Sequence, residues 1–190
     1  NGTTGTGGAD LVPAGTTYSW TVDPNSNVTG QSAQNNKATV SQTLTNGTAT
    51  AQIVTYTVTP KSGDCVGDNF TVTVTVNPKP AIAAQTYTIC TGDAVPFATK
   101  TGDVVPAGTK YTWVIATDNT NVSGQSAETT TPQDAFAQTL TNATATAQTL
   151  TYTVTPMSGT CQGDDFTVEI TVNPKPAISN KTYTICSGDK

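Results

Sequence analysis

TATAQIVTYTVTPKSGDCVGDNFTVTVTVNPKPAI, residues 48–82, returns at 144–178 as TATAQTLTYTVTPMSGTCQGDDFTVEITVNPKPAI. Aligned without gaps at an offset of 96 residues, the two stretches agree at 27 of 35 positions. A fixed internal period of this length indicates a tandem repeat. Each copy is expected to contain two strands joined by a Cys-containing turn and closed by an Asn-Pro-Lys-Pro segment. The sequence therefore predicts an array of repeats of about 96 residues.

The clearest strands alternate apolar and polar residues. Residues 109–115 (TKYTWVI) place Tyr111, Trp113 and Ile115 on one face, and 149–155 and 165–172 show the same alternation. Thr and Val favour strands, turn residues recur at roughly every 8–12 positions, and no stretch has the period of a helix. We expect an all-β, immunoglobulin-like sandwich of about seven strands per copy, with the tryptophan of each copy in its core.

The repeat divides the chain into three segments. Residues 1–80 are predicted to form a repeat that lacks its first strand, residues 81–176 a complete repeat, and residues 177–190 the first strand of a following repeat. That first strand is QTYTIC at 85–90 and KTYTIC at 181–186. In the complete repeat, a second strand that carries Val95 and Phe97 is expected to follow it after a turn. We therefore expect the chain to be a window cut from a longer array.

Two proline-containing linkers join the predicted repeats. Proline fixes φ and restricts the residue before it, so two prolines in four residues favour an extended, semi-rigid joint. The sequence thus predicts a rod-like array. The linker residues are Asn77, Pro78, Lys79 and Pro80 in the first copy, and Asn173, Pro174, Lys175 and Pro176 in the second.

Composition argues against several classes of function. The net charge is −5, only 11% of residues are charged, and the chain has no His. Because all eight basic residues are Lys and none cluster, neither nucleic acid nor anionic lipid is an expected partner. No apolar run is long enough to span a membrane. Catalysis needs a base or nucleophile held by partners, so we predict no catalytic residues, no enzymatic activity and no cofactor.

Several motifs occur together across nearly the whole chain. They are TYTIC-[ST]-G-D, a Tyr-x-Trp strand, QTLTN, YTVTP, a Cys-x-Gly turn and the NPKP ending. This combination resembles the PKD-like, immunoglobulin-like repeats of very large surface adhesins in Bacteroidota. These include the gliding-motility adhesins exported by type IX secretion. One departure is that the Trp-Asp-Phe-Gly-Asp-Gly signature of true PKD domains is absent, because Trp20 is followed by Thr21, Val22 and Asp23.

The resemblance implies an extracellular, cell-surface setting. We expect a structural and adhesive repeat that forms the stalk of a large adhesin or filament. Neighbouring repeats of the same chain are the expected partners, and surface polysaccharide or other cell-surface components are further candidates. Two alternatives stay open: an accessory, carbohydrate-associated module of a secreted polysaccharide-degrading enzyme, and a filament subunit that exchanges the QTYTIC strand between chains.

The four cysteines are sparse and regularly spaced, at Cys65, Cys90, Cys161 and Cys186. Without His or a C-x2-C spacing they do not indicate zinc, and disulfides in an exported protein are the better interpretation, with free buried thiols as the alternative. In an immunoglobulin-like sandwich, the start of the first strand and the turn between the last two strands lie at one pole. Cys90 could pair with Cys161 in its own copy or with Cys65 across the linker. We therefore predict a disulfide between Cys90 and Cys161, with Cys65 and Cys186 left unpaired.

That disulfide would bring Asp93 beside Asp164 and Asp165. Three carboxylates at one pole could bind calcium. The alternative, which we prefer, is that Gly-Asp sequences simply make good turns, so no metal site is predicted. Glycosylation sequons, which matter only where the host makes that linkage, occur on expected loops or strand ends at Asn27, Asn46, Asn69, Asn121 and Asn142.

Overall fold

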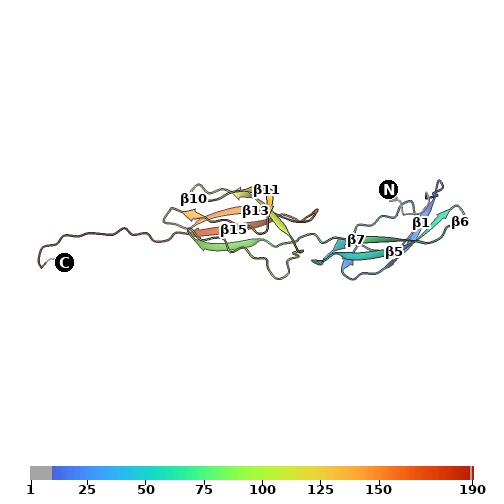
Figure 1. Cartoon of the computed structure of the whole chain (residues 1–190), viewed down its shortest axis with the longest axis horizontal. Coiled ribbons are helices and arrows are strands. Elements are labelled where there is room, and N and C mark those ends of the chain that lie inside the picture. The colour runs from blue at the N-terminus through green and yellow to red at the C-terminus, as the bar shows by residue number, and fades with distance from the viewer. Residues whose placement is uncertain (1–9, 189) are drawn as a thin grey trace. The chain divides into compact units, whose positions relative to one another are not determined.

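A computed structural model describes residues 10–188 and 190, and within these residues all regular structure is β (Figure 1). The chain divides into two compact units, which we describe separately. One contains the residues up to Ile82 together with Thr101–Thr109 and Met157–Gly163, and the other contains Ala83–Lys100, Lys110–Pro156 and the residues from Asp164 onward. In the part of the chain described, no helix could cross a membrane.

From residue 10 onward, the first copy contains seven strands. Its main sheet has the order β3-β1-β5-β6, and β7 pairs with β5, while β2 and β4 form a small second sheet. Each of these pairs is antiparallel. The strands are β1 (Thr17–Asp23), β2 (Val28–Thr29), β3 (Gln34–Lys37), β4 (Thr45–Asn46), β5 (Gln52–Ser62), β6 (Cys65–Val66) and β7 (Phe70–Val76).

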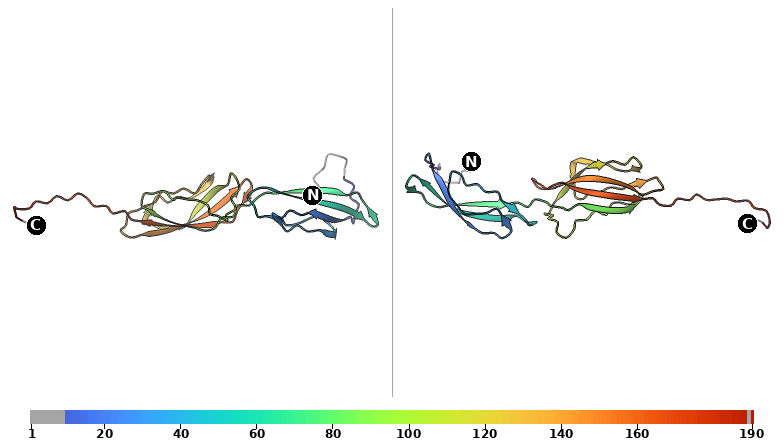
Figure 2. Two further views of the ribbon diagram at one scale, coloured as in Figure 1. Left: turned by 90° about the horizontal axis from the view of Figure 1, so that it is seen from below. Right: turned by 180° about the vertical axis from the view of Figure 1, so that it is seen from behind.

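The second copy adds a strand at the edge of its sheet. The main sheet has the order β11-β9-β13-β15-β8, with β14 paired to β13 and a small sheet of β10 and β12 (Figure 2). β8 lies parallel to β15, from the pair Gln85 and Val168 to the pair Cys90 and Asn173. The strands are β8 (Gln85–Cys90), β9 (Lys110–Thr117), β10 (Val122–Ser123), β11 (Glu128–Gln133), β12 (Thr141–Asn142), β13 (Gln148–Ser158), β14 (Cys161–Gln162) and β15 (Phe166–Asn173).

Alternation along the central strands produces the core. In β13, Leu150, Tyr152 and Val154 are fully buried between threonines, and the apolar residues of β15 are buried in the same way. A strand points successive side chains to opposite faces, so this pattern gives each main sheet one apolar face. The two layers pack as a sandwich, and the predicted all-β tandem fold is confirmed.

The tryptophans lie in the core as expected. Trp20 and Trp113 are buried, and each indole N–H donates to a backbone carbonyl, that of Ser32 or Ser126, at 2.9 Å. In the second copy the Phe136 ring lies 5.1 Å from Trp113 and 5.0 Å from Tyr152, both edge to face. Such aromatic contacts add to the stabilisation from burial alone.

One expected strand is nearly absent. A strand carrying Val95 and Phe97 was predicted, but the structure has only an isolated bridge between Ala94 and Thr139, followed by a hydrogen bond from the Val95 N–H to the Gln138 carbonyl at 2.9 Å. The intervening Pro96 has no N–H to donate, so the ladder cannot continue.

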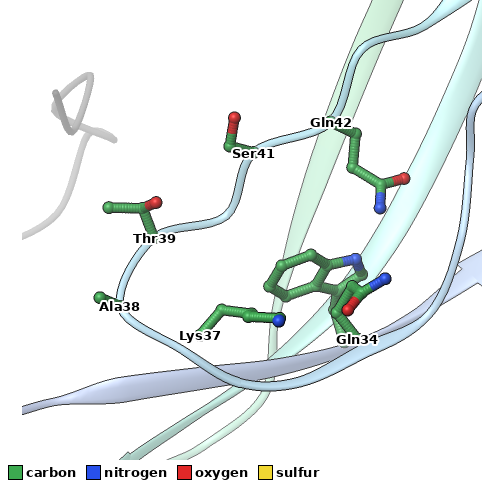
Figure 3. Close-up of a pocket in the computed structure, with 7 residues that line it drawn as sticks. Gln34, Lys37, Ala38, Thr39, Ser41 and Gln42 are labelled. Carbon is green, nitrogen blue, oxygen red and sulfur yellow. The ribbon is translucent and has the colours of Figure 1, made fainter.

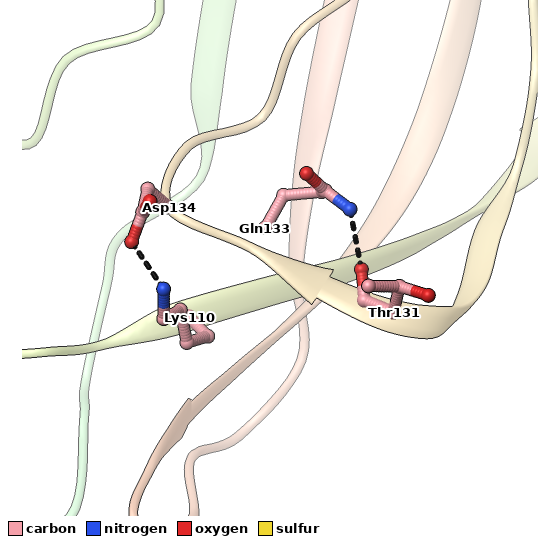
Figure 4. A network of polar contacts seen from close by, with 4 residues as sticks. All are labelled: Lys110, Thr131, Gln133 and Asp134. Carbon is pink, nitrogen blue, oxygen red and sulfur yellow. Dashed lines mark hydrogen bonds and ion pairs between the residues drawn. The ribbon is translucent and has the colours of Figure 1, made fainter.

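The β9–β11 edge is irregular and is held by side chains. Between its two register pairs, β11 advances five residues while β9 advances two, so the register shifts between the two pairs. Figure 4 shows the Lys110 ammonium paired with the Asp134 carboxylate and the Gln133 amide donating to the Thr131 carbonyl. The backbone N–H groups of Thr131 and Thr130 donate to the Glu128 carboxylate and lower its pKa.

Candidate functional site at the repeat joint

The end of β15, where the second linker begins, is held by the side chain of Asn142. This side chain is buried, and its Nδ2 donates to the carbonyls of Val172 and Thr146, both at 2.8 Å. Its Oδ1 accepts from the Thr144 N–H at 2.9 Å and the Thr144 hydroxyl at 2.8 Å. One amide thus joins the last strand to the loop after β12.

The first copy has the same corner. The Asn46 amide donates to the carbonyls of Thr50 at 2.8 Å and Val76 at 2.9 Å, and its oxygen accepts two hydrogen bonds from Thr48. Because Asn46 and Asn142 are buried and their amides already donate twice, neither is available in the folded protein as a glycosylation acceptor. The sequons at Asn27, Asn69 and Asn121 are exposed.

The turn after β8 holds the start of the second linker. The Thr91 N–H donates to the Asn173 carbonyl at 2.9 Å, and the Thr91 hydroxyl accepts from the Asn142 N–H at 2.7 Å. The next N–H, from Gly92, donates to the Leu140 carbonyl at 2.8 Å. The turn therefore connects the first strand, the loop before β12 and the linker within one copy.

An ion pair extends this contact further along the linker. The Lys175 Nζ lies 2.8 Å from the Asp93 Oδ1, and both side chains are about half exposed, at 52%. The hydrogen bond from Lys175 lowers the pKa of Asp93, and the same bond raises the pKa of Lys175. Solvent screens such a pair, so its role is to orient the linker more than to stabilise the fold.

The first linker has its own anchors. Pro80 is buried, and Ala81, which follows it, exchanges backbone hydrogen bonds with Val104 at 2.8 and 2.9 Å. In the second linker Pro174 is half-buried and Pro176 exposed. Before the buried Pro80, Asn77 is exposed and Pro78 is half-buried. Lys79, between the two prolines, is exposed and takes part in an interaction with another group of the protein.

The structure does not bring Cys90 and Cys161 together. Cys90 lies beside Asn173 at the end of β15, whereas Cys161 pairs with Ser158 beyond the start of β15. Seven steps along a strand span about 23 Å, and a disulfide requires Cα atoms within about 7 Å of each other. All four cysteines are free. The expectation of a shared pole was wrong, because Cys90 ends the first strand and that strand runs parallel to the last.

The same separation affects the carboxylates. Asp93 follows β8 at one end of the sheet, while Asp164 and Asp165 precede β15 at the other, where Asp165 accepts a 2.6 Å hydrogen bond from the Thr155 hydroxyl. Among residues 10–188 and 190, no cluster of three or more His, Cys, Asp or Glu side chains could hold a metal ion. The structure therefore gives the calcium alternative no support.

A shallow hollow of about 380 Å³ lies beside Trp20 (Figure 3). Trp20 is only 4% exposed, so its ring is not a platform for a sugar. In the second copy Phe136 occupies the position of Val40 and packs on Trp113. Its lining residues are Trp20, Gln34, Lys37, Ala38, Thr39, Ser41 and Gln42.

Sequence reasoning missed the buried amides. It identified Asn46 and Asn142 only as sequons, although both stand in the repeated TN dipeptide that lies one residue before the TATAQ stretch of each copy. It also missed Gln42 and Gln138, whose side-chain oxygens accept the tyrosine hydroxyls of Tyr56 and Tyr152 at 3.0 and 3.1 Å. The signal that could have identified these four residues is that each asparagine and each glutamine occupies the same position in both copies.

Comparison with solved structures finds fragments of protocadherins and of Dlar at low similarity. The first two domains of human mucin-like protocadherin are 16% identical with a TM-score of 0.30, and 87% of each chain is covered. The tandem Ig repeats of Dlar are 14% identical with a TM-score of 0.29, and 84% of each chain is covered. Domains 3–6 of protocadherin gammaB7 are 14% identical with a TM-score of 0.30, covering 84% of this chain and 42% of that one.

The comparison with curated proteins finds no match. The family comparison is specific, since the PKD-like domain matches residues 7–80 and again residues 87–176. Together these two matches cover most of the sequence and fall on the two copies that the internal repeat defines. The chain therefore belongs to the PKD-like domain family.

Proposed function

We propose that this chain is a spacer segment in the stalk of a large extracellular surface adhesin. The observation that carries the proposal is that the buried indole and asparagine groups shared by both copies form hydrogen bonds within the fold itself. The indole N–H groups of Trp20 and Trp113 and the amides of Asn46 and Asn142 all bond to backbone carbonyls within their own copy. These shared groups therefore maintain the fold of each copy, and a stable fold is all that a spacer requires.

The joint supports the same proposal. The hydrogen bond from Thr91 to Asn173 and the ion pair between Asp93 and Lys175 fix the position of the chain at and beyond the end of β15. Proline on either side of Lys175 limits the remaining freedom. We infer that the repeats divide at 80/81 and 176/177, where the family matches also end, and that the joint is semi-rigid. A repeat spacing of about 40 Å follows from strand and linker lengths.

The setting is inferred from the motifs. The TYTIC-[ST]-G-D and NPKP elements resemble those of Bacteroidota surface adhesins, so we place the chain outside the cell, on a surface, with type IX export and gliding motility as the expected context. In this proposal the chain is not an enzyme. Surface polysaccharide would be bound by another part of the parent protein, or by many weak contacts summed along the array.

Binding assays on the purified 190-residue chain test the proposal. The chain would be titrated against surface polysaccharides, host glycans and abiotic surfaces, with an unrelated protein of similar charge as the control. The spacer role predicts no saturable binding that exceeds the control. Tight, saturable binding to one defined polysaccharide would overturn it and would support the accessory-module alternative. In the parent protein, removing copies is expected to shorten reach without abolishing adhesion.

A further inference from the structure

Two strands of the second copy lie directly on the path between its linkers. The chain comes from the first linker into β8, and it passes from the end of β15 into the second linker. These two strands are neighbours in the sheet, and Figure 1 shows β8, in green, lying along β15. Tension applied through the two linkers therefore acts first on this pair of strands.

The two strands run parallel, and this direction decides how tension acts on them. Six successive pairs join them, from Gln85 with Val168 to Cys90 with Asn173. Because the strands are parallel, the linker before β8 and the linker after β15 attach at opposite ends of the pair. Tension then pulls the strands past each other along their length, and the evenly spaced hydrogen bonds of the ladder share the load. In an antiparallel pair both linkers would attach at one end, and the pairs would open one after another.

Both strands are anchored, so neither can slide alone. β15 is paired on its other side with β13 through seven antiparallel pairs. β8 places Gln85 and Ile89 in buried positions, and the Tyr87 hydroxyl bonds to both backbone groups of Ala98 at 3.1 and 3.3 Å. Sliding β8 along β15 would therefore break these contacts as well as the ladder.

The contacts at the start of the second linker lie on the same path. The Thr91 N–H donates to the Asn173 carbonyl at 2.9 Å, which continues the ladder past Cys90. The ion pair of 2.8 Å between Lys175 and Asp93 joins the linker to the chain that follows β8. Both contacts connect the chain after β15 to the chain after β8, so tension on the second linker acts on them together with the six pairs.

We propose that β8 and β15 form a mechanical clamp, which lets this repeat bear tension along the chain without unfolding. The clamp consists of the six parallel pairs and the hydrogen bond from Thr91 to Asn173. Its use in the parent protein rests on the stalk role proposed above, since a stalk that holds a cell to a surface is under tension whenever the two move apart. The resistance itself depends only on the fold of the second copy.

Single-molecule force spectroscopy of the full chain tests the clamp by changing only the direction of the pull. Handles are attached to two introduced cysteines, in a chain whose four native cysteines are replaced by serine. With handles at Ala84→Cys and Ala177→Cys, the force shears β8 against β15. With handles at Ala84→Cys and Asp164→Cys, the force acts on the neighbouring first ends of the same two strands and opens the pairs one after another. All three positions are exposed.

The shearing pull should require about twofold or more the force of the opening pull at the same loading rate, because several hydrogen-bonded pairs must break together. The two variants should have the same urea midpoint, so that the difference in force comes from the direction of the pull. If Asp164→Cys lowers that midpoint, Gln162→Cys supplies the opening pull instead, since this residue is also exposed and also precedes β15. Equal rupture forces in the two directions would overturn the clamp.

This result is independent of the binding assays. Saturable binding of one polysaccharide would overturn the spacer role and leave the clamp intact. Equal rupture forces would overturn the clamp and leave the spacer role as it stands.

Discussion

Replacing Asn142 by Ala should destabilise the second copy more than any other single polar substitution at the joint. The side chain is 4% exposed and makes four hydrogen bonds of 2.8 to 2.9 Å. Alanine leaves the two carbonyls and the Thr144 groups without these partners. Asn142→Asp is expected to be at least as damaging at neutral pH, because a carboxylate oxygen would then face the two carbonyls.

The magnitude follows from how deeply each partner is buried. The Val172 carbonyl lies in a fully buried residue, and an unsatisfied buried acceptor costs about 1–3 kcal/mol. The Thr146 and Thr144 groups are closer to solvent and can bond to water, so together they add about 1 kcal/mol. We therefore expect the free energy of unfolding of the second copy to fall by about 2–4 kcal/mol.

Urea unfolding followed by tryptophan fluorescence measures this change. In a Trp20→Phe background Trp113 is the only tryptophan, so the signal reports the second copy alone. Asn121→Ala is the matched control, because its exposed amide makes a single 3.3 Å bond to Gln148 and should change stability by less than about 0.5 kcal/mol. If Asn142→Ala and Asn121→Ala unfold at the same urea concentration, the buried corner does not stabilise the joint.

Three further predictions concern charge and backbone. Lys175→Met should lower the melting temperature slightly at pH 7, because it removes the ion pair with Asp93. The folded-state pKa of Asp93 is lowered, so the difference in melting temperature between the variant and the wild type should fade in acid as that carboxyl is protonated. A difference that persists in acid would contradict the pairing. Burial raises the pKa of Tyr152 to about 12, so wild-type stability should decline between about pH 10 and 12, and a Tyr152→Phe chain that declines equally in thermal melts would refute this. Gly124→Ala places a Cβ against the backbone carbonyl of Thr139. It should cost well over the roughly 1 kcal/mol expected for Gly108→Ala, where the space is open and φ is also positive. Equal urea midpoints for the two variants would exclude that close approach.

The strand pattern and the repeat were readable from the sequence because they depend on local chemistry. Alternation in TLTYTVT and DFTVEITV predicts which side chains face inward, and Trp20 and Trp113 lie where that period puts them. The breaks were harder to place. Pro96 interrupts the predicted second strand because it cannot donate a backbone hydrogen bond. The loss of this donor outweighs the strand preference of the apolar residues beside it.

The joint was less predictable because it depends on contacts between distant residues. Nothing in QTYTIC shows that β8 runs parallel to β15, and that direction decides which end of the sheet Cys90 occupies. The disulfide prediction failed there. Likewise, the hydrogen bond from Asn142 to Val172 joins residues 30 apart, so the local sequence around Asn142 shows only a sequon.

Small-angle X-ray scattering of the purified chain, extrapolated to zero concentration, tests the spacer role most directly. A semi-rigid proline joint predicts a pair-distance distribution with a second maximum near the repeat spacing of about 40 Å, unchanged by salt. A single compact maximum, with the two copies folded against each other, would contradict the spacer role.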